Sequence, residues 1–245
     1  MFIAGNWKMN GTVAEAQALA QALVNGLPEG APATAIFPPA LHLAAVSDVI
    51  KASPIFMGGQ DCSGAENGAH TGDLSVAMLS DIGARGVIVG HSERRTDHGE
   101  SNEAILAKVQ AGQSAGLGVV LCVGETLEQR KSGDAETVVQ SQLAACLPTT
   151  FASGSVVIAY EPVWAIGTGM VATVDDISAM HSMIRRWLQQ NRPEIAETFI
   201  LYGGSVKASN AADVFGADEV GGALVGGASL KSDDFLGIIA AAMKA

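Results

Sequence analysis

VVIAYEP, residues 156 to 162, runs from an apolar, β-rich segment into a carboxylate at Glu161 and stops at Pro162. Seven more short apolar runs recur along the chain: FIAGNWK (2–8), TAIFPP (34–39), IFMGGQ (55–60), GVIVGH (86–91), GVVLCVG (118–124), FILYGG (199–204) and GALVGG (222–227). Most are apolar on both faces, as parallel strands covered by helices are. These runs predict eight buried strands.

Amphipathic helical patterns lie between the runs. The first, TVAEAQALAQALVNGL, opens with Thr12 and Glu15 in the arrangement of a capping box, and Thr173 with Asp176 repeats it. The apolar face of the first pattern comprises Val13, Ala16, Leu19, Ala20 and Leu23. Dividing 245 residues by eight gives about 31 per unit, the size of a strand with its crossover helix. We therefore predict an α/β protein, a single (β/α)8 TIM barrel domain over residues 1–245, because a doubly wound open sheet usually has fewer strands.

Composition narrows the classes of partner. Hydrophobic residues make up 48% of the chain and charged residues 16%, which suits a compact α/β protein. The formal net charge of -11 argues against a nucleic acid or an anionic membrane as partner, because both require a basic face. If the ligand is anionic, groups within its binding site must attract it, because the net charge of the chain does not.

The cysteines and the N-terminus predict the compartment. Three cysteines at spacings that match no zinc or disulfide pattern predict reduced thiols, with Cys122 packed inside a strand. The start of the chain, MFIAGNWKMNG, lacks a basic segment followed by a long apolar one, and 18 uninterrupted apolar residues occur nowhere. We expect a soluble, cytoplasmic protein.

Polar residues follow several of the predicted strands, at the end where barrel enzymes hold their active sites. Asn6 and Lys8 end the first run, His91 ends the fourth and Glu161 the sixth. Asn6 and Lys8 are two positions apart, so in a strand their side chains face the same side and offer an amide and a cation to an anionic ligand. We expect all four residues at one mouth of the barrel.

Glu161 is the candidate base. Its neighbours in the sequence are Tyr160, Pro162, Val163 and Trp164. These largely apolar neighbours predict a partly desolvated carboxylate, which suits proton abstraction. A solvated loop carboxylate or a structural ion pair is the alternative interpretation.

His91, within GHSERR (90–95), is a candidate to polarise a carbonyl or to move a proton. The turn after it predicts a helix N-terminus, whose positive end lowers the pKa of an imidazole. A packed or exposed histidine is the alternative. Glu93, Arg94 and Arg95 are candidates for a structural ion network around the mouth, and we prefer this interpretation for the two arginines.

Glycine pairs follow the last two strands, in YGGS (202–205) and VGGAS (225–229). Barrels frequently bind phosphate with backbone N–H groups at these two loops, and ordinary turns are the alternative. PVWAIGTG (162–169) has Pro162 at its entry and Gly167 and Gly169 at its exit, so it could close as an apolar flap that excludes water. A rigid connection is the alternative there.

Six motifs together resemble the triosephosphate isomerase family, in order and over essentially the whole chain. They are NWKMNG (6–11), GHSERR (90–95), CVGE (122–125), AYEPVWAIGTG (159–169), YGGSV (202–206) and LVGGASL (224–230). The resemblance implies a cofactor-free, metal-free isomerase of glycolysis and gluconeogenesis. It would interconvert dihydroxyacetone phosphate and D-glyceraldehyde 3-phosphate through an enediolate.

The resemblance also implies roles for individual residues. In this family a glutamate base and a neutral histidine electrophile act together, which assigns these roles to Glu161 and His91. Lys8 and Asn6 become substrate contacts. The implied phosphate-binding residues are Gly167, Ser205, Gly226 and Gly227. The implied lid comprises Pro162, Val163, Trp164, Ala165, Ile166, Gly167, Thr168 and Gly169.

A homodimer is implied as well, because QDCSGAENGAHTG (60–72) matches the family's interdigitating loop and Thr71 would reach the partner's active site. Asp97 and Gly221 depart from the family's pattern. Two other functions remain open: a phosphate-handling barrel with different chemistry, and a catalytically inactive barrel that binds metabolites or other molecules. The second would predict the loss of Lys8, His91 or Glu161, and the chain keeps all three.

Overall fold

The computed structural model, which describes residues 1–151, 156–166 and 170–245, contains a closed barrel of parallel strands in the order β1 to β8. The strands are β1 (Phe2–Asn6), β2 (Ala33–Phe37), β3 (Phe56–Gly59), β4 (Gly86–Val89), β5 (Gly118–Val123), β6 (Val156–Tyr160), β7 (Ile200–Tyr202) and β8 (Gly222–Val225). The last strand closes the barrel against the first, because β1 pairs in parallel with both β2 and β8. The predicted (β/α)8 barrel is confirmed.

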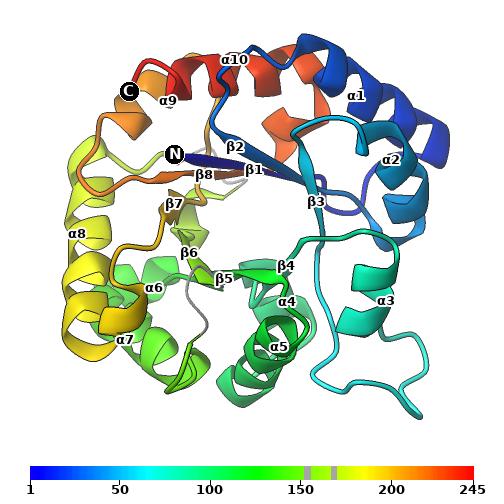
Figure 1. The fold of residues 1–245 in the computed structure, drawn as a ribbon. Coiled ribbons are helices and arrows are strands. Elements are labelled where there is room, and N and C mark those ends of the chain that lie inside the picture. The colour runs from blue at the N-terminus through cyan, green and yellow to red at the C-terminus, as the bar shows by residue number, and fades with distance from the viewer. Residues whose placement is uncertain (152–155, 167–169) are drawn as a thin grey trace.

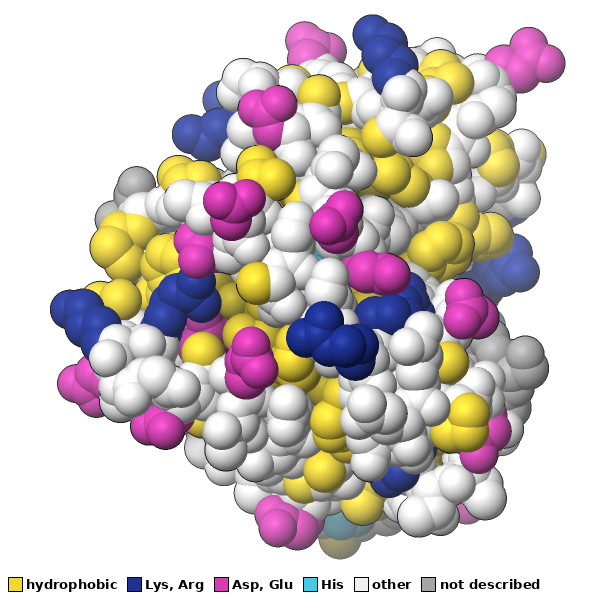
Figure 2. Space-filling view, turned by 90° about the vertical axis from the view of Figure 1, so that its left-hand side faces the viewer, with side chains coloured by type: hydrophobic (Ala, Val, Ile, Leu, Met, Phe, Trp, Pro, Cys, Tyr) yellow, Lys and Arg dark blue, Asp and Glu magenta, His cyan; other side chains and the backbone are white. Residues whose placement is uncertain are grey.

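Helices surround the ring of strands (Figure 1). They are α1 (Val13–Gly26), α2 (Leu43–Ile50), α3 (Val76–Asp81), α4 (Ser92–Asp97), α5 (Asn102–Ser114), α6 (Leu127–Lys131), α7 (Ala135–Cys146), α8 (Val174–Asn191), α9 (Ala211–Phe215) and α10 (Ser232–Ala242). Four short 3-10 turns, Ala40–His42, Val163–Ala165, Pro193–Ile195 and Gly227–Leu230, complete the helical elements of the described residues. Seen from the side of α8, the surface mixes acidic, basic and apolar side chains (Figure 2).

Two apolar layers hold the barrel together. One lies between strands and helices, and the other fills the barrel interior. The interior layer comprises Ala4, Ala35, Phe37, Ile88, Val120, Cys122, Ala159, Leu201 and Leu224. Because successive strand residues face opposite sides, this layer and the outer one account for strands that are apolar on both faces. Cys122 is fully buried, as the sequence predicts.

Helix α1 begins as the sequence predicts. The hydroxyl of Thr12 accepts the N–H of Glu15, and the Glu15 carboxylate accepts the N–H of Thr12, which completes the capping box. Ala16, Ala20 and Leu23 are buried against the core. Val13 was expected on this face, but it is 43% exposed because the buried stripe begins one turn later. Thr173 and Asp176 form the second predicted capping box, at the start of α8.

We expect Thr12→Ala to lower the free energy of unfolding by about 1 kcal/mol, since the first turn of α1 loses its cap. For a chain of this size that corresponds to a fall in Tm of about 2–4 °C, measurable by calorimetry. Thr137→Ala is the matched control, because Thr137 is exposed within α7. There the same change should leave Tm equal or slightly higher, since alanine is the better helix former. Equal losses in both variants would contradict a capping role.

Candidate active site

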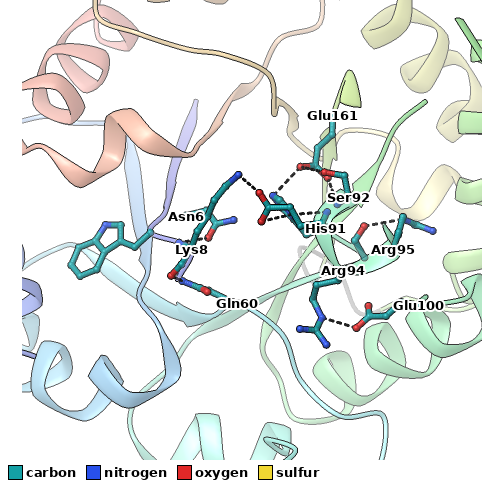
Figure 3. A network of polar contacts seen from close by, with 12 residues as sticks. Asn6, Lys8, Gln60, His91, Ser92, Arg94, Arg95, Glu100 and Glu161 are labelled. Carbon is teal, nitrogen blue, oxygen red and sulfur yellow. Dashed lines mark hydrogen bonds and ion pairs between the residues drawn. The ribbon is translucent and has the colours of Figure 1, made fainter. Parts of the chain in front are cut away.

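The ends of β1, β4 and β6 bring four predicted residues to one mouth of the barrel (Figure 3). Asn6 is the last residue of β1, His91 follows β4 and Glu161 follows β6. They lie far apart in the chain, yet Nε2 of His91 is 3.0 Å from Oε1 of Glu161. Parallel strands of a closed barrel end on the same side, which is why the three side chains converge.

Backbone contacts fix the position of Glu161. Its N–H donates to the carbonyl of Val123 at 2.8 Å, which extends the β5–β6 ladder by one residue. Glycines flank it closely: a Cβ at Gly124 would lie 1.8 Å from the Glu161 carbonyl oxygen, and one at Gly203 would lie 2.9 Å from its Cγ. No side chain fits at either position without displacing the glutamate.

The Glu161 carboxylate is buried more deeply than the sequence predicts, with 1% of the residue exposed. Oε2 accepts the backbone N–H of Ser92 at 2.9 Å, while Oε1 accepts the Ser92 hydroxyl at 3.3 Å and faces His91. Burial by itself raises the pKa of Glu161, but His91, the Ser92 N–H and Lys8 together lower it. The side chain is therefore held as a carboxylate, which is the form a base requires.

His91 is the N-cap residue of α4, as predicted. Its Nδ1 accepts the backbone N–H of Glu93 at 3.3 Å, so that nitrogen carries no proton and the ring hydrogen of the neutral form lies on Nε2. Burial lowers the pKa of His91, yet the charges of Glu161 and Glu93 outweigh it and raise the pKa overall, so the expectation of a lowered pKa at a helix N-terminus was wrong. The Nε2–H group points at Oε1 of Glu161.

Lys8 lies at the site, but it reaches it from a turn after β1 and not from the strand itself. The strand ends at Asn6, and Lys8 has a φ of 52°, outside the extended region. The Asn6 side chain accepts the N–H of Lys8 at 3.0 Å, a local turn that competes with continuing the strand. The expectation that Asn6 and Lys8 share one face of a strand was therefore wrong. The Lys8 ammonium nevertheless lies in the mouth, where it forms an ion pair with Glu93.

A cavity of about 750 Å³ opens above these residues. Its lining includes Lys8, Glu93, Ser205, Gly226 and Gly227. A Cβ added at Gly226 would come within 3.3 Å of the Lys8 side chain, and one at Gly227 would meet nothing within 4 Å. Three of the four predicted phosphate-binding residues thus line one space, and the fourth, Gly167, lies outside the described residues.

Part of the predicted lid is described. Val163–Ala165 form a short 3-10 turn, and Ile166 lines the cavity. The indole N–H of Trp164 donates to Oε1 of Glu125 at 2.7 Å, and the Tyr160 hydroxyl donates to the same oxygen at 3.1 Å. Gly167, Thr168 and Gly169 lie outside the described residues.

Several contacts of the site were not predicted. Ser92 belongs to the quoted GHSERR motif, but only its position at a helix start hinted that it would bond to Glu161. Glu93, a candidate for an ion network at the mouth, pairs there with Lys8, and its N–H donates to His91. Glu125, in the quoted CVGE motif, is fully buried. The arginines are structural, as interpreted: Arg94 pairs with Asp61 and Glu100. Arg95 donates to the Gly90 carbonyl oxygen.

Comparison with known proteins places this arrangement in a family. The family model described as triosephosphate isomerase matches residues 1–242. The chain belongs to the triosephosphate isomerase family. It is 52% identical over 243 residues to a curated triosephosphate isomerase of Caulobacter vibrioides, covering 98% of this chain and 95% of that one. Over 250 residues it is 50% identical to that of Acidiphilium cryptum, covering 99% and 98%.

Solved structures agree with this family assignment. A crystal structure of triosephosphate isomerase from Bartonella henselae superposes with a TM-score of 0.91 at 44% identity, covering 98% of both chains. Like the other members of this isomerase family, the chain is an isomerase. Among its described helices none has the length and apolarity to span a membrane. In the same residues no group of three or more His, Cys, Asp and Glu side chains is arranged to hold a metal ion.

His181 of α8 is a buried histidine directly behind the site. Its ring packs edge-on against Tyr160, with centroids 5.8 Å apart, and tilted toward Tyr202 at 6.4 Å. Burial lowers the pKa of His181 to about 4, and the nearby Arg185 charge adds to this. The ring is therefore neutral in the folded protein at neutral pH.

This burial predicts a loss of stability in acid. The unfolded chain binds a proton at His181 near pH 6.5 and the folded chain only near 4, so the unfolded state gains protons first as the pH falls. The contribution of neutral His181 to the free energy of unfolding is fully present above pH 6.5. It decreases by about 3 kcal/mol as the pH falls to 4. His181→Asn should flatten the pH dependence of the urea midpoint in this window. The exposed His98→Asn should not, and parallel curves for all three proteins would contradict the assignment.

Proposed function

We propose that the cluster at this mouth interconverts dihydroxyacetone phosphate and D-glyceraldehyde 3-phosphate, with Glu161 as the base. The observation that carries the proposal is the 3.0 Å contact between Glu161 and His91, at the mouth where a lysine and two glycine-rich loops line a cavity. Relatives named triosephosphate isomerase at about half identity support the choice of substrate. Residues 1–245 act as one domain in this proposal, because the site draws on β1, β4, β6, β7 and β8 together.

Glu161 takes a proton from the carbon beside the carbonyl group. A carboxylate with almost no exposure is poorly hydrated, so it accepts a proton more readily once a substrate is in place. A substrate seated between Glu161 and His91 would separate the two side chains and replace their direct contact. Each then faces a different atom of the substrate.

His91 and Lys8 stabilise the negative charge that forms on the substrate oxygens. The Nε2–H of His91 can donate one hydrogen bond, and the ammonium of Lys8 supplies a positive charge, with the Asn6 amide assisting. Glu161 then returns the proton to the neighbouring carbon. A hydroxyl proton also passes from one substrate oxygen to the other, through Nε2 of His91. Because only protons move, the reaction requires no cofactor and no metal ion.

Backbone amides at the ends of β7 and β8 bind the phosphate group. Ser205, Gly226 and Gly227 line the same cavity as Lys8, which supports this role. Glycines let the main chain approach an anion closely. Gly167 is proposed as a fourth contact from the loop that follows β6.

The segment from Pro162 to Gly169 serves as a lid. Ile166 places an apolar side chain beside the cavity, and Trp164 is anchored to Glu125, which supports a defined position for this part of the loop. A closed lid would exclude water and suppress elimination of phosphate from the enediolate. Val163 and Ala165 also belong to the part of the proposed lid that the structure describes.

The protein is proposed to be a cytoplasmic homodimer. The segment between β3 and α3 extends away from the ring of helices (Figure 1), and Thr71 within it is exposed. Met9, which follows β1, is 95% exposed, and Leu41, which follows β2, is 89% exposed. Strand β2 pairs with β3. Exposed apolar side chains beside a protruding loop suit an interface. The three cysteines are free thiols, which suits a reducing compartment.

Glu161→Gln keeps the shape of the side chain and removes the base. We expect kcat in a coupled isomerase assay to fall by about 10²- to 10⁴-fold, with an unchanged far-UV circular dichroism spectrum. Glu128→Gln, an exposed change of the same kind on α6, should retain full activity. Activity near that of the unmodified protein in Glu161→Gln would remove the assignment of Glu161 as base.

Sedimentation tests the dimer. The unmodified protein should sediment at twice the chain mass of 25.0 kDa. Thr71→Arg places a charge in the proposed interface, so it should shift the protein toward the single-chain mass and lower activity in proportion. Thr137→Arg, an equally exposed change on α7, should do neither. A single-chain mass for the unmodified protein at micromolar concentration would contradict the proposal.

A further inference from the structure

A second cavity lies at the opposite end of the barrel from the candidate active site. Its volume is about 470 Å³, and it is bordered by the first residues of β1, β3, β4 and β5 and by the residues just before β7. Its principal side chains are Phe2, Phe37, Phe56, Arg85, Glu197 and Phe199. No step of the proposed isomerisation uses any of them.

Missing side chains inside the barrel create this space. Ile88 on β4 and Val120 on β5 face the interior, so by alternation Gly86 and Gly118 do so as well, one layer lower. Barrel interiors are usually filled by bulky side chains in such layers. Here two neighbouring strands contribute none, and the lowest layer is left open.

Aromatic rings form the walls. Four of the seven phenylalanines of the chain line this one cavity. The Phe37 ring lies against Gly58 of β3, where an added Cβ would come within 2.4 Å of it. Phe199 stands at the rim and is 42% exposed, and Gly221 makes room for it, since a Cβ there would lie 3.0 Å from the ring. Rings arranged this way favour another aromatic ring as their neighbour.

Arg85 supplies a charge at the entrance. Its guanidinium lies 4.4 Å from the centroid of the Phe56 ring. Among the described residues it forms no ion pair, although the chain carries a net charge of -11. Glu197, also on the rim and equally unpaired within the described part of the chain, would repel a second negative charge. The entrance therefore suits a ligand with one anionic group.

We propose that this cavity binds a small aromatic monocarboxylate, with its ring among the phenylalanines and its carboxylate on Arg85. An enclosed apolar cavity of about 150 Å³ holds a benzene ring, so the present volume accommodates a phenyl group with a short chain. Guanidinium and carboxylate pair with two parallel hydrogen bonds, which fixes the orientation of the ligand. A ligand of about eleven heavy atoms should bind with a Kd on the order of 0.1–1 mM.

The test measures binding of 3-phenylpropionate to the full-length protein by calorimetry and ligand-observed NMR. Saturable binding to the unmodified protein is expected. Arg85→Met keeps an apolar stem and removes the charge, so it should weaken 3-phenylpropionate about tenfold and leave the uncharged 3-phenylpropanol unchanged. An equal loss for both probes, or no loss for either, would overturn the role of Arg85.

Gly118→Val fills the cavity from inside. A Cβ at Gly118 meets only the Arg85 carbonyl oxygen, at 3.5 Å, so the backbone accepts a side chain there. This variant should lose binding of both probes and keep its isomerase activity. If it does not fold, Val157→Phe blocks the same space from β6. Binding that persists in the filled variant would overturn the site. So would the lack of saturable binding below about 10 mM, which is about tenfold above the upper end of the expected Kd range.

Glu161→Gln separates this proposal from the isomerase assignment. Because the two sites lie at opposite ends of the barrel, this variant should bind 3-phenylpropionate as the unmodified protein does. Loss of binding in Glu161→Gln would place the probe in the active-site cavity and overturn the inference. Loss of isomerase activity alone would leave it standing.

Discussion

The buried carboxylate of Glu161 is the constraint on which the site depends. Moving an unpaired carboxylate out of water costs several kcal/mol even after the protein relaxes, so the surroundings must compensate for it. Here the Ser92 N–H, the Ser92 hydroxyl and the His91 ring do so, all from the turn that begins α4. The carboxylate on β6 and the helix start after β4 therefore need each other, and only a closed barrel with aligned strand ends brings them together.

The same constraint explains nearby glycines. Gly124 and Gly203, which follow β5 and β7 on either side of β6, leave no space for a side chain beside Glu161. A methyl group at Gly124 would overlap the glutamate carbonyl oxygen, and one at Gly203 would press on its Cγ. These glycines are needed for close packing around one side chain, and neither has a positive φ. Flexibility is not their role.

The sequence predicted much of this because its signals are local and repeated. Strand runs apolar on both faces, capping boxes at Thr12 and Thr173, and polar residues at strand ends each depend on a few neighbouring positions. What it missed depends on turns and on contacts between distant segments. The turn that takes Lys8 out of the strand is made by the Asn6 side chain, and period-two alternation cannot foresee it. The burial of Glu161 could not be predicted either, because it depends on how closely the residues after β5 and β7 pack around it.

The pairing of Lys8 with Glu93 bears on how an acidic chain receives an anion. A net charge of -11 opposes a phosphate ester at long range, although salt screens that repulsion beyond about 8–10 Å. Inside the mouth the balance differs, because the ammonium of Lys8 lies against the carboxylate of Glu93 and the two nearly cancel. Lys207, Lys231 and Asp234 also line the cavity, so its formal charges nearly balance, and part of the attraction for the phosphate must come from groups that carry no formal charge. The backbone N–H groups proposed to bind the phosphate, on the loops after β7 and β8, suit that need, since their partial charges are fixed in direction and require no counter-ion. An acidic protein can in this way select an anion by shape and position, without a basic surface.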